Sequence, residues 1–292
     1  MDIIYIGLGQ VQKCLSMDWS KIQKMEINKN QIKIQELTLQ KIFTEEDLFP
    51  REFTSFEKRN YGFLFFNEQN KDSYDSNHAL IYKNKISDIK LVLKEIINFY
   101  KTKNITPNIY ESIFDDEYFE QIKNELENFG FEIFTETQRY MILKEENKIK
   151  PNPEIEIKKI DKWNDEYGKE IFEKSNESYG IEVLKKSLLN NNTIFYVAFY
   201  KNIPVGMTYA HITNEVCRVD YLLVSKEYRN MGIARTIINY FVKYCKENKI
   251  ETCYLWPDGE TAEKIYHEAG FRHVVTKNVG RASYKNLTNT KY

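Results

Sequence analysis

The same order of elements occurs twice in the chain, and this repeat constrains its fold more than any other feature. Residues 89–100 carry apolar side chains at the spacing of one helical face, and a connecting stretch, a second helical run and Gly130-Phe131 follow. Residues 234–245 show the same spacing, and a connecting stretch, a helical run and Gly270-Phe271 follow. We interpret this order as a diverged duplication of one module.

Two prolines mark the join between the copies. Pro151 and Pro153 follow the charged run from Lys144 to Lys150. Such a stretch continues neither a helix nor a central strand, because proline lacks the backbone N–H. We therefore expect two domains, residues 1–150 and 151–292. A chain of 292 residues is long enough to build a core in each.

In the second half, the periodicity predicts hairpin strands first and alternating strands and helices later. This order is typical of an α/β fold. Strands are predicted at 155–160, 193–200, 205–211, 217–224, 252–256, 271–276 and 282–284, and helices at 163–178, 181–189, 234–245 and 262–269.

Composition excludes several classes of protein. Apolar residues make up 42% and charged residues 29%, which is typical of a soluble globular chain. The net charge of −1 gives no reason to expect a nucleic acid or an anionic membrane as a partner. No basic leader and no run long enough to span a membrane is present, so we expect a cytoplasmic protein.

The sequence contains fragments that resemble metal-binding and dinucleotide-binding motifs, but none of them has the required spacing. The four cysteines have no ligand spacing, which indicates a reduced intracellular protein without disulfides. His267-Glu268 and His273 do not form HExxH, because the second histidine comes six residues after the first. Gly7-Leu8-Gly9 lacks the third glycine of a dinucleotide fingerprint, with Gln12 at that place. We expect no metal.

The turn from Arg229 to Ala234, RNMGIA, has the composition of an anion cradle. It lies between a predicted strand and a predicted helix, and the first N–H groups of a helix are unpaired and carry partial positive charge. Gly232 and Ala234 leave room for a diphosphate to approach the backbone, and Arg229 adds a charged donor. Taken alone, the turn fits an ordinary strand-to-helix connection equally well.

Its neighbours favour the cradle. The stretch VSKEYRNMGIA, residues 224–234, resembles the acetyl-CoA-binding motif of the GNAT superfamily of N-acetyltransferases, RxxGxA in this chain. The stretch AEKIYHEAGF, residues 262–271, resembles the second signature of that superfamily, AxxxYxxxGF. The spacing of the two motifs and the order of strands before them match as well. The resemblance covers residues 151–292 and, weakly, the later part of the first half.

The resemblance implies a fold and a cofactor site. The fold would be two GNAT-like modules in tandem, each with a mixed, largely antiparallel central sheet flanked by helices. The backbone of Leu222, Leu223 and Val224 would pair with the pantetheine arm of acetyl-CoA. A splay of the sheet after Val224 would admit the thioester beside Trp256. The diphosphate would be bound by the N–H groups of Arg229, Asn230, Met231, Gly232, Ile233, Ala234 and Arg235.

The resemblance also implies two catalytic groups, because an amine attacking a thioester needs a base for its proton and an acid for the departing thiolate. Tyr266 matches the general acid of the superfamily. Strand alternation places Arg218, Asp220, Leu222 and Val224 on one face, and Asp220 is the expected base. Asp220 could equally be an ion-pair partner of Arg218, and His211 or a water chain are rival bases. Three residues before the Ala of the second signature, Gly259 stands where the family often has an Asn that contacts the cofactor.

The first half lacks the cradle. The equivalent stretch, Lys83 to Lys90, contains no glycine, so we expect a degenerate, non-catalytic module. The whole chain is therefore expected to be an acetyl-CoA-dependent N-acetyltransferase. Its acceptor would be a primary amine of a small molecule, in preference to that of a peptide or protein, selected by residues 163–189 and the partner domain. The alternative is a non-catalytic protein that binds an acyl-CoA as a sensor or scaffold.

Overall fold

The computed structural model describes residues 19–285 except 116, 179 and 214–215, with side chains from residue 33 onward. Gly7-Leu8-Gly9 and Cys14 lie outside the described residues. The chain divides into two compact units, 1–42 and 43–292. Helix α2 (Trp19–Leu48) ends inside the second unit, and all later elements belong to that unit. Every helix among the described residues is too short or too polar to cross a bilayer.

The second unit contains both copies of the predicted module. We call residues 49–143 the first module. Its elements are η1 (Phe49–Glu52), β1 (Ser55–Arg59), β2 (Gly62–Phe66), β3 (His78–Ile81), η2 (Lys83–Lys85), α3 (Ile89–Thr102), β4 (Asn108–Glu111), α4 (Tyr118–Gln121), α5 (Lys123–Asn128) and β5 (Phe131–Leu143).

We call residues 155–284 the second module, and its elements follow the predicted order. They are β6 (Ile155–Lys159), α6 (Asp165–Tyr167), the π-helix η3 (Gly168–Glu173), α7 (Gly180–Ser187), β7 (Thr193–Tyr200), β8 (Ile203–Ile212), β9 (Cys217–Val224), η4 (Lys226–Tyr228), α8 (Ile233–Glu247), β10 (Cys253–Leu255), α9 (Glu260–Glu268) and β11 (Phe271–Tyr284). One prediction was wrong: residues 271–276 and 282–284 belong to one strand.

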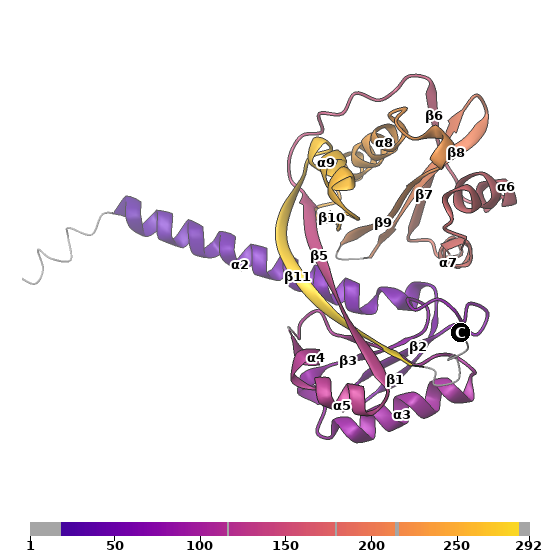
Figure 1. The fold of residues 1–292 in the computed structure, drawn as a ribbon. Coiled ribbons are helices and arrows are strands. Elements are labelled where there is room, and N and C mark those ends of the chain that lie inside the picture. The colour runs from indigo at the N-terminus through magenta and orange to yellow at the C-terminus, as the bar shows by residue number, and fades with distance from the viewer. Residues whose placement is uncertain (1–18, 116, 179, 214–215, 286–292) are drawn as a thin grey trace, which may run out of the picture. The chain divides into compact units, whose positions relative to one another are not determined.

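The two modules share one mixed sheet and exchange a strand. The strand order is β1-β2-β3-β4-β11-β5-β10-β9-β8-β7-β6. Strand β11, from the second module, lies between β4 and β5, and β5, from the first module, lies between β11 and β10. Figure 1 shows these two long strands running side by side through both modules. The α/β fold with two modules in tandem is confirmed, and the boundary at residue 150 stays a prediction.

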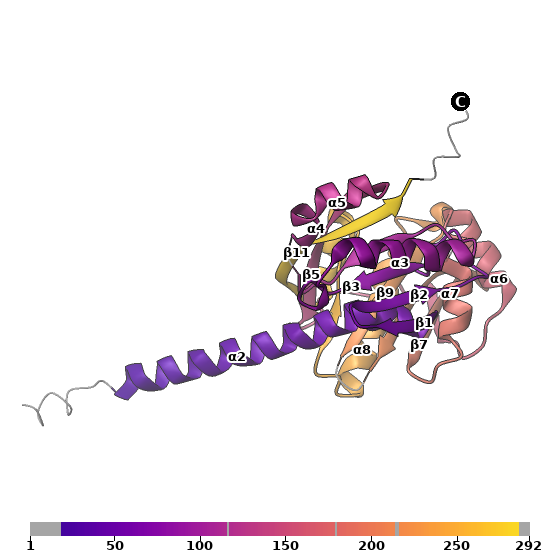
Figure 2. The same ribbon diagram turned by 90° about the horizontal axis from the view of Figure 1, so that it is seen from below.

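Amphipathic helices cover each half of the sheet. In the first module, α3 buries Val92, Leu93, Ile96 and Tyr100 against strands β2 to β4 (Figure 2). In the second module, α8 buries Ile237, Ile238 and Phe241, as its apolar spacing predicts. The opposite face of β7 to β9 packs against α6, η3 and α7. Both faces of this sheet are therefore covered.

A β-bulge at Asp220 changes the faces of strand β9. Tyr221 pairs with Tyr209 of β8 and Val219 pairs with Ala210, so Asp220 is an extra residue. Leu222 packs in the core under α8. The prediction that Arg218, Asp220, Leu222 and Val224 share one face was wrong, because a bulge resets the two-residue alternation of a strand.

Candidate functional site

The sheet of the second module opens between β9 and β10. These parallel strands pair only at Cys217 with Cys253 and at Arg218 with Tyr254. Beyond Arg218, the edge of β9 that faces β10 has no strand partner among the described residues. The opening was predicted after Val224, and it begins earlier, after Arg218. It leaves the backbone of Leu222, Leu223 and Val224 free to pair with a ligand.

The start of α8 has the geometry of an anion cradle. Asn230 and Gly232 both have left-handed backbone conformations, with φ of 66° and 75°. Gly232 is the N-cap of α8, and no side chain caps this helix end. The first intrahelical bond runs from the N–H of Thr236 to the carbonyl of Gly232 at 2.9 Å. The N–H groups from Ile233 to Arg235 are therefore available to a ligand.

Side chains around the cradle hold its backbone. The Asn152 amide donates to the carbonyl of Met231 at 2.9 Å, and the Asn152 N–H donates to the Thr236 hydroxyl at 2.9 Å. The guanidinium of Arg235 makes two hydrogen bonds to Glu268, of 2.6 and 2.9 Å. Arg229 donates to the carbonyl of Val224 at 3.3 Å. The proline-rich join is therefore part of the scaffold that positions this turn.

The first module closes the equivalent position with a carboxylate. Asp88 is the N-cap of α3, and its side chain accepts from the N–H groups of Lys90 at 2.9 Å and Leu91 at 3.3 Å. These are the donors that an anionic ligand would need. The lack of glycine indicated a lost cradle, and the structure adds that an acidic cap fills it.

Tyr266 lies on α9 and borders the same cavity as Leu222 and Asp220. The residue is 7% exposed, and its ring contacts Phe271 edge-on at 5.9 Å. Its hydroxyl makes no hydrogen bond to the described residues, and burial raises its pKa well above the usual value for tyrosine. A phenol in this state keeps its proton at neutral pH and can donate a hydrogen bond to a ligand.

Asp220 is an ion-pair partner of Arg218 and also lines the cavity. One carboxylate oxygen accepts from the Arg218 guanidinium, and the other accepts from the Tyr209 hydroxyl. Both sequence-based interpretations of Asp220 are therefore compatible with its position. The rival base, His211, is fully buried, and burial lowers its pKa to about 4, so its ring is neutral at pH 7.

Glu46, an acidic residue at the end of α2, was not among the predicted site residues. Glu46 accepts hydrogen bonds from Arg218 at 2.7 Å, from the Tyr254 hydroxyl at 2.8 Å and from the Trp256 indole at 3.3 Å. Arg218 also stacks on the ring of Phe49, 3.8 Å from its centroid. Nothing in the local sequence around Glu46 indicates this role, because its partners are about 170 to 210 residues away.

One cavity of about 610 Å³ joins these groups and has walls from both modules. Asp220, Arg229 and Tyr266 border it from the second module, next to the opening between β9 and β10. His78 and Tyr110 border it from the first module. The cavity therefore gives a small molecule access to the open edge of β9 and to the Tyr266 hydroxyl.

One protein family matches the second module. The acetyltransferase (GNAT) family matches residues 157–271, which include both motifs, the opening and the cradle. Residues 157–271 are therefore similar to the GNAT superfamily. Members of this family transfer an acyl group and use acetyl-CoA as the donor, so the match supports an acyltransferase activity for residues 157–271. Among curated proteins, none matches the sequence of the chain.

Several solved structures have a similar fold. A GCN5-related N-acetyltransferase from Kribbella flavida is 10% identical, with 84% of this chain and 95% of that chain covered and a TM-score of 0.63. A functionally unknown conserved protein from Staphylococcus epidermidis is 14% identical, with coverage of 80% and 95% and a TM-score of 0.54. A tandem GNAT protein from the clavulanic acid biosynthesis pathway is 10% identical, with coverage of 70% and 75% and a TM-score of 0.50. At these identities the likeness establishes the fold alone.

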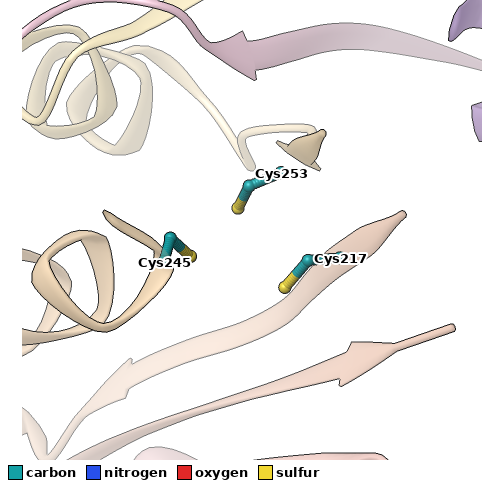
Figure 3. Close-up of side chains that lie close together, drawn as sticks. All are labelled: Cys217, Cys245 and Cys253. Carbon is teal, nitrogen blue, oxygen red and sulfur yellow. The ribbon is translucent and has the colours of Figure 1, made fainter. Parts of the chain in front are cut away.

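The second module also brings three cysteines together (Figure 3). Cys217 on β9, Cys245 on α8 and Cys253 on β10 are buried, and their sulfur atoms lie within 4.8 Å of one another. A hydrogen bond with the Cys245 thiol raises the pKa of Cys217 and burial raises the pKa of Cys253, whereas hydrogen bonds with these two thiols lower the pKa of Cys245 to about 5. Spacing along the chain gave no sign of this group.

Proposed function

We propose that the protein is an acetyl-CoA-dependent N-acetyltransferase that acetylates a primary amine of a small molecule. Catalysis belongs to the second module, and the first module contributes the far wall of the acceptor site. The observation that carries the proposal is the continuity of one cavity from the open edge of β9 to Tyr266. The donor and the acceptor can then meet at one point, which is the main requirement for direct transfer.

The donor end of the site uses backbone groups. The pantetheine arm pairs with Leu222, Leu223 and Val224 along the unpaired edge of β9. The N–H groups of the turn from Arg229 to Arg235 bind the diphosphate, and the left-handed Gly232 turns them toward one point. Gly259, where other members often have Asn, has a φ of 84° and no atom within 4 Å of the place where a Cβ would lie. The cofactor arm is therefore held mainly from the β9 side.

The acceptor end favours a cation. Three arginines, Arg218, Arg229 and Arg281, border the cavity against eight carboxyl groups, and burial raises the pKa of two of these, Asp47 and Glu111. A primary amine is protonated at pH 7, so this excess of negative charge attracts it. The eight carboxyl groups are those of Glu46, Asp47, Asp75, Glu111, Glu136, Glu177, Asp220 and Asp258.

The acidic groups form clusters in both modules. On the first-module side, Arg281 contacts Glu136 at 2.6 Å and Asp75 at 4.0 Å. On the second-module side, Arg218 contacts Glu46 and Asp220. Each guanidinium thus balances the charge of one of its two carboxylates. One negative charge is left uncompensated beside Arg281 and one beside Arg218. An amine without a carboxylate of its own suits such a cavity best, because an acidic acceptor would be repelled.

The chemistry assigns one proton to each catalytic group. Asp220 takes the proton from the acceptor ammonium, and the free amine attacks the thioester carbonyl to form a C–N bond as the C–S bond breaks. The Tyr266 hydroxyl donates to the departing sulfur, so coenzyme A leaves as a thiol. The opening between β9 and β10 supplies the place where the carbonyl lies during attack.

The test is release of coenzyme A thiol from acetyl-CoA by the purified full-length chain with a panel of amines. The panel contains a diamine, an amino sugar, a neutral amino acid and a dicarboxylic amino acid. We expect turnover with amines that lack a carboxylate, and a product that mass spectrometry identifies as the N-acetyl amine. If the chain binds acetyl-CoA by calorimetry and no amine of any kind releases thiol, the sensor or scaffold alternative is favoured.

Tyr266→Phe tests the acid within the same assay. The hydroxyl makes no hydrogen bond to the described residues, so its loss leaves folding and cofactor binding nearly unchanged. General acid catalysis contributes roughly 100-fold or more, and we expect kcat to fall by about that factor. Turnover equal to the wild type would exclude Tyr266 as the acid. Tyr228→Phe, in the half-buried turn η4 before the cradle, serves as a matched control that keeps full activity.

A further inference from the structure

The thiols of Cys217, Cys245 and Cys253 are unused by acetyl transfer. They come from three different elements of the second module, and each thiol-bearing residue is 1% exposed or less. In Figure 3 the three sulfur atoms face one common space between β9, β10 and the end of α8. Their surroundings are apolar and include Ile238 and Phe241.

The spacing of the sulfur atoms fits a metal ion at their centre. A zinc–sulfur bond is about 2.3 Å long, so three sulfurs around one ion in a plane lie about 4.0 Å apart. The observed separations, all within 4.8 Å, therefore need to shrink by less than an ångström. Among the described residues no histidine or carboxylate joins the group, so the ion would have three protein ligands.

The ligand type and the burial together restrict the metal. Thiolates select soft ions such as Zn²⁺ and Cu(I), whereas Mg²⁺ and Ca²⁺ require oxygen ligands. Three thiolates around a divalent ion carry a net charge of −1, and around Cu(I) a net charge of −2. Because charge is costly in an apolar core, the divalent ion fits better.

We propose that Cys217, Cys245 and Cys253 form a site for a soft divalent d¹⁰ metal ion, the class of Zn²⁺ and Cd²⁺. Three metal–sulfur bonds form, and the protons of the thiols pass to solvent as the thiolates bind. The proposal is independent of the acetyl-transfer reaction.

The position of the site gives the metal a structural consequence. Cys217 and Cys253 are paired residues of β9 and β10, one pair before the point where these strands part. Cys245 lies in the last turns of α8, whose first turn forms the cradle. A bound ion therefore fastens the closed end of the opening to α8, and it holds together the elements that build the cofactor site.

The test uses Cd²⁺, because cadmium–thiolate bonds give an ultraviolet charge-transfer band. The full-length chain is titrated with Cd²⁺ in the folded state, and a second sample is refolded with Cd²⁺ present because the thiols are buried. We expect a band that saturates at one ion per chain in at least one of the two samples, together with a higher melting temperature. X-ray absorption of the loaded wild type should count three sulfur ligands.

Two variants make the assignment specific. Cys245→Ser removes one ligand and should abolish stoichiometric binding, whereas Cys14→Ser replaces the remaining cysteine of the sequence and should leave binding unchanged. Folding of each variant is checked by circular dichroism. If Cys245→Ser does not fold, the sulfur count in the wild type decides alone. No band in either wild-type sample, fewer than three sulfurs, or loss of the band in Cys14→Ser would overturn the proposal, and the thiols would then be ordinary apolar core.

Discussion

Replacing Gly232 by glutamate should remove acetyl-CoA binding while the protein stays folded. A Cβ at this position would meet only the Cβ of Asn152, at 3.8 Å, which is an ordinary contact. The cost to folding is therefore the left-handed backbone, φ 75°, which disfavours a non-glycine residue by about 1–2 kcal/mol. A domain of this size tolerates such a loss.

The effect on binding should be larger. The new carboxylate adds a negative charge beside the N–H groups of Ile233, Ala234 and Arg235, which no side chain caps in the wild type. Hydrogen bonds to a charged group contribute about 1.5–3 kcal/mol each, so the loss of two weakens binding by at least about 100-fold. Calorimetric titration with acetyl-CoA measures this directly, with urea denaturation as the check on folding.

Gly130→Glu is the matched control. Gly130 has a φ of 88°, and a Cβ there would lie 3.4 Å from the Tyr284 ring, so the backbone strain and the added charge are similar. It precedes β5 in the first module and lies outside the cradle. We expect wild-type affinity for acetyl-CoA from this variant. Binding by Gly232→Glu within threefold of the wild type, or an equal loss in Gly130→Glu, would refute the assignment of the cradle.

Three further changes test the scaffold around the site. Asn152→Ala removes the amide that donates to the Met231 carbonyl. We expect the free energy of unfolding to fall by about 1 kcal/mol in urea denaturation and acetyl-CoA binding to weaken in calorimetry. Unchanged binding would contradict a positioning role for Asn152. Arg218→Met leaves Glu46 and Asp220 buried without their cation, and should lower the free energy of unfolding by about 3–5 kcal/mol, whereas a loss below about 1 kcal/mol would show that the pair is not needed. Burial raises the pKa of Asp47 from 3.8 to about 7, so its stabilising contribution is present below pH 4 and is lost as the pH rises through 7. Asp47→Asn cannot lose this proton, so between pH 4 and 8 the wild type should lose about 2–4 kcal/mol relative to the variant in urea denaturation, and parallel pH profiles would contradict the shift.

Local periodicity was sufficient to predict most elements of the second module, because α8 and most of its strands bury a regular pattern of apolar residues. The predicted strands 193–200 and 217–224 agree with β7 and β9, and the predicted helix 234–245 lies within α8. In contrast, the pairing between strands far apart in the sequence was not predictable. The pairing of β11 with β4 joins residues about 170 positions apart, and alternation along either strand contains no information on which distant strand it meets.

The part of the candidate site that depends on backbone conformation was predictable, because a residue type such as glycine indicates that conformation. Position 232 has a left-handed backbone, which glycine adopts readily, and the neighbouring residues match a known motif. The acidic wall was not predictable, because Glu46 and Asp75 reach the cavity only through tertiary packing. Asp220 shows the same limit on a smaller scale: the bulge arises from the register between β8 and β9, so face assignments from one strand alone fail beyond it.

The strand exchange explains why a module without a cradle persists in the chain. Strand β5 of the first module pairs with β10 through Met141 and Ile142, next to the strand end that leads to Trp256. In return, β11 of the second module completes the first module between β4 and β5. Each module's part of the shared sheet contains a strand of the other copy, so the first module is required for the structure of the second whether or not it binds a cofactor. At the helix start of the first module, the Asp88 side chain satisfies two α3 N–H groups and stabilises the helix.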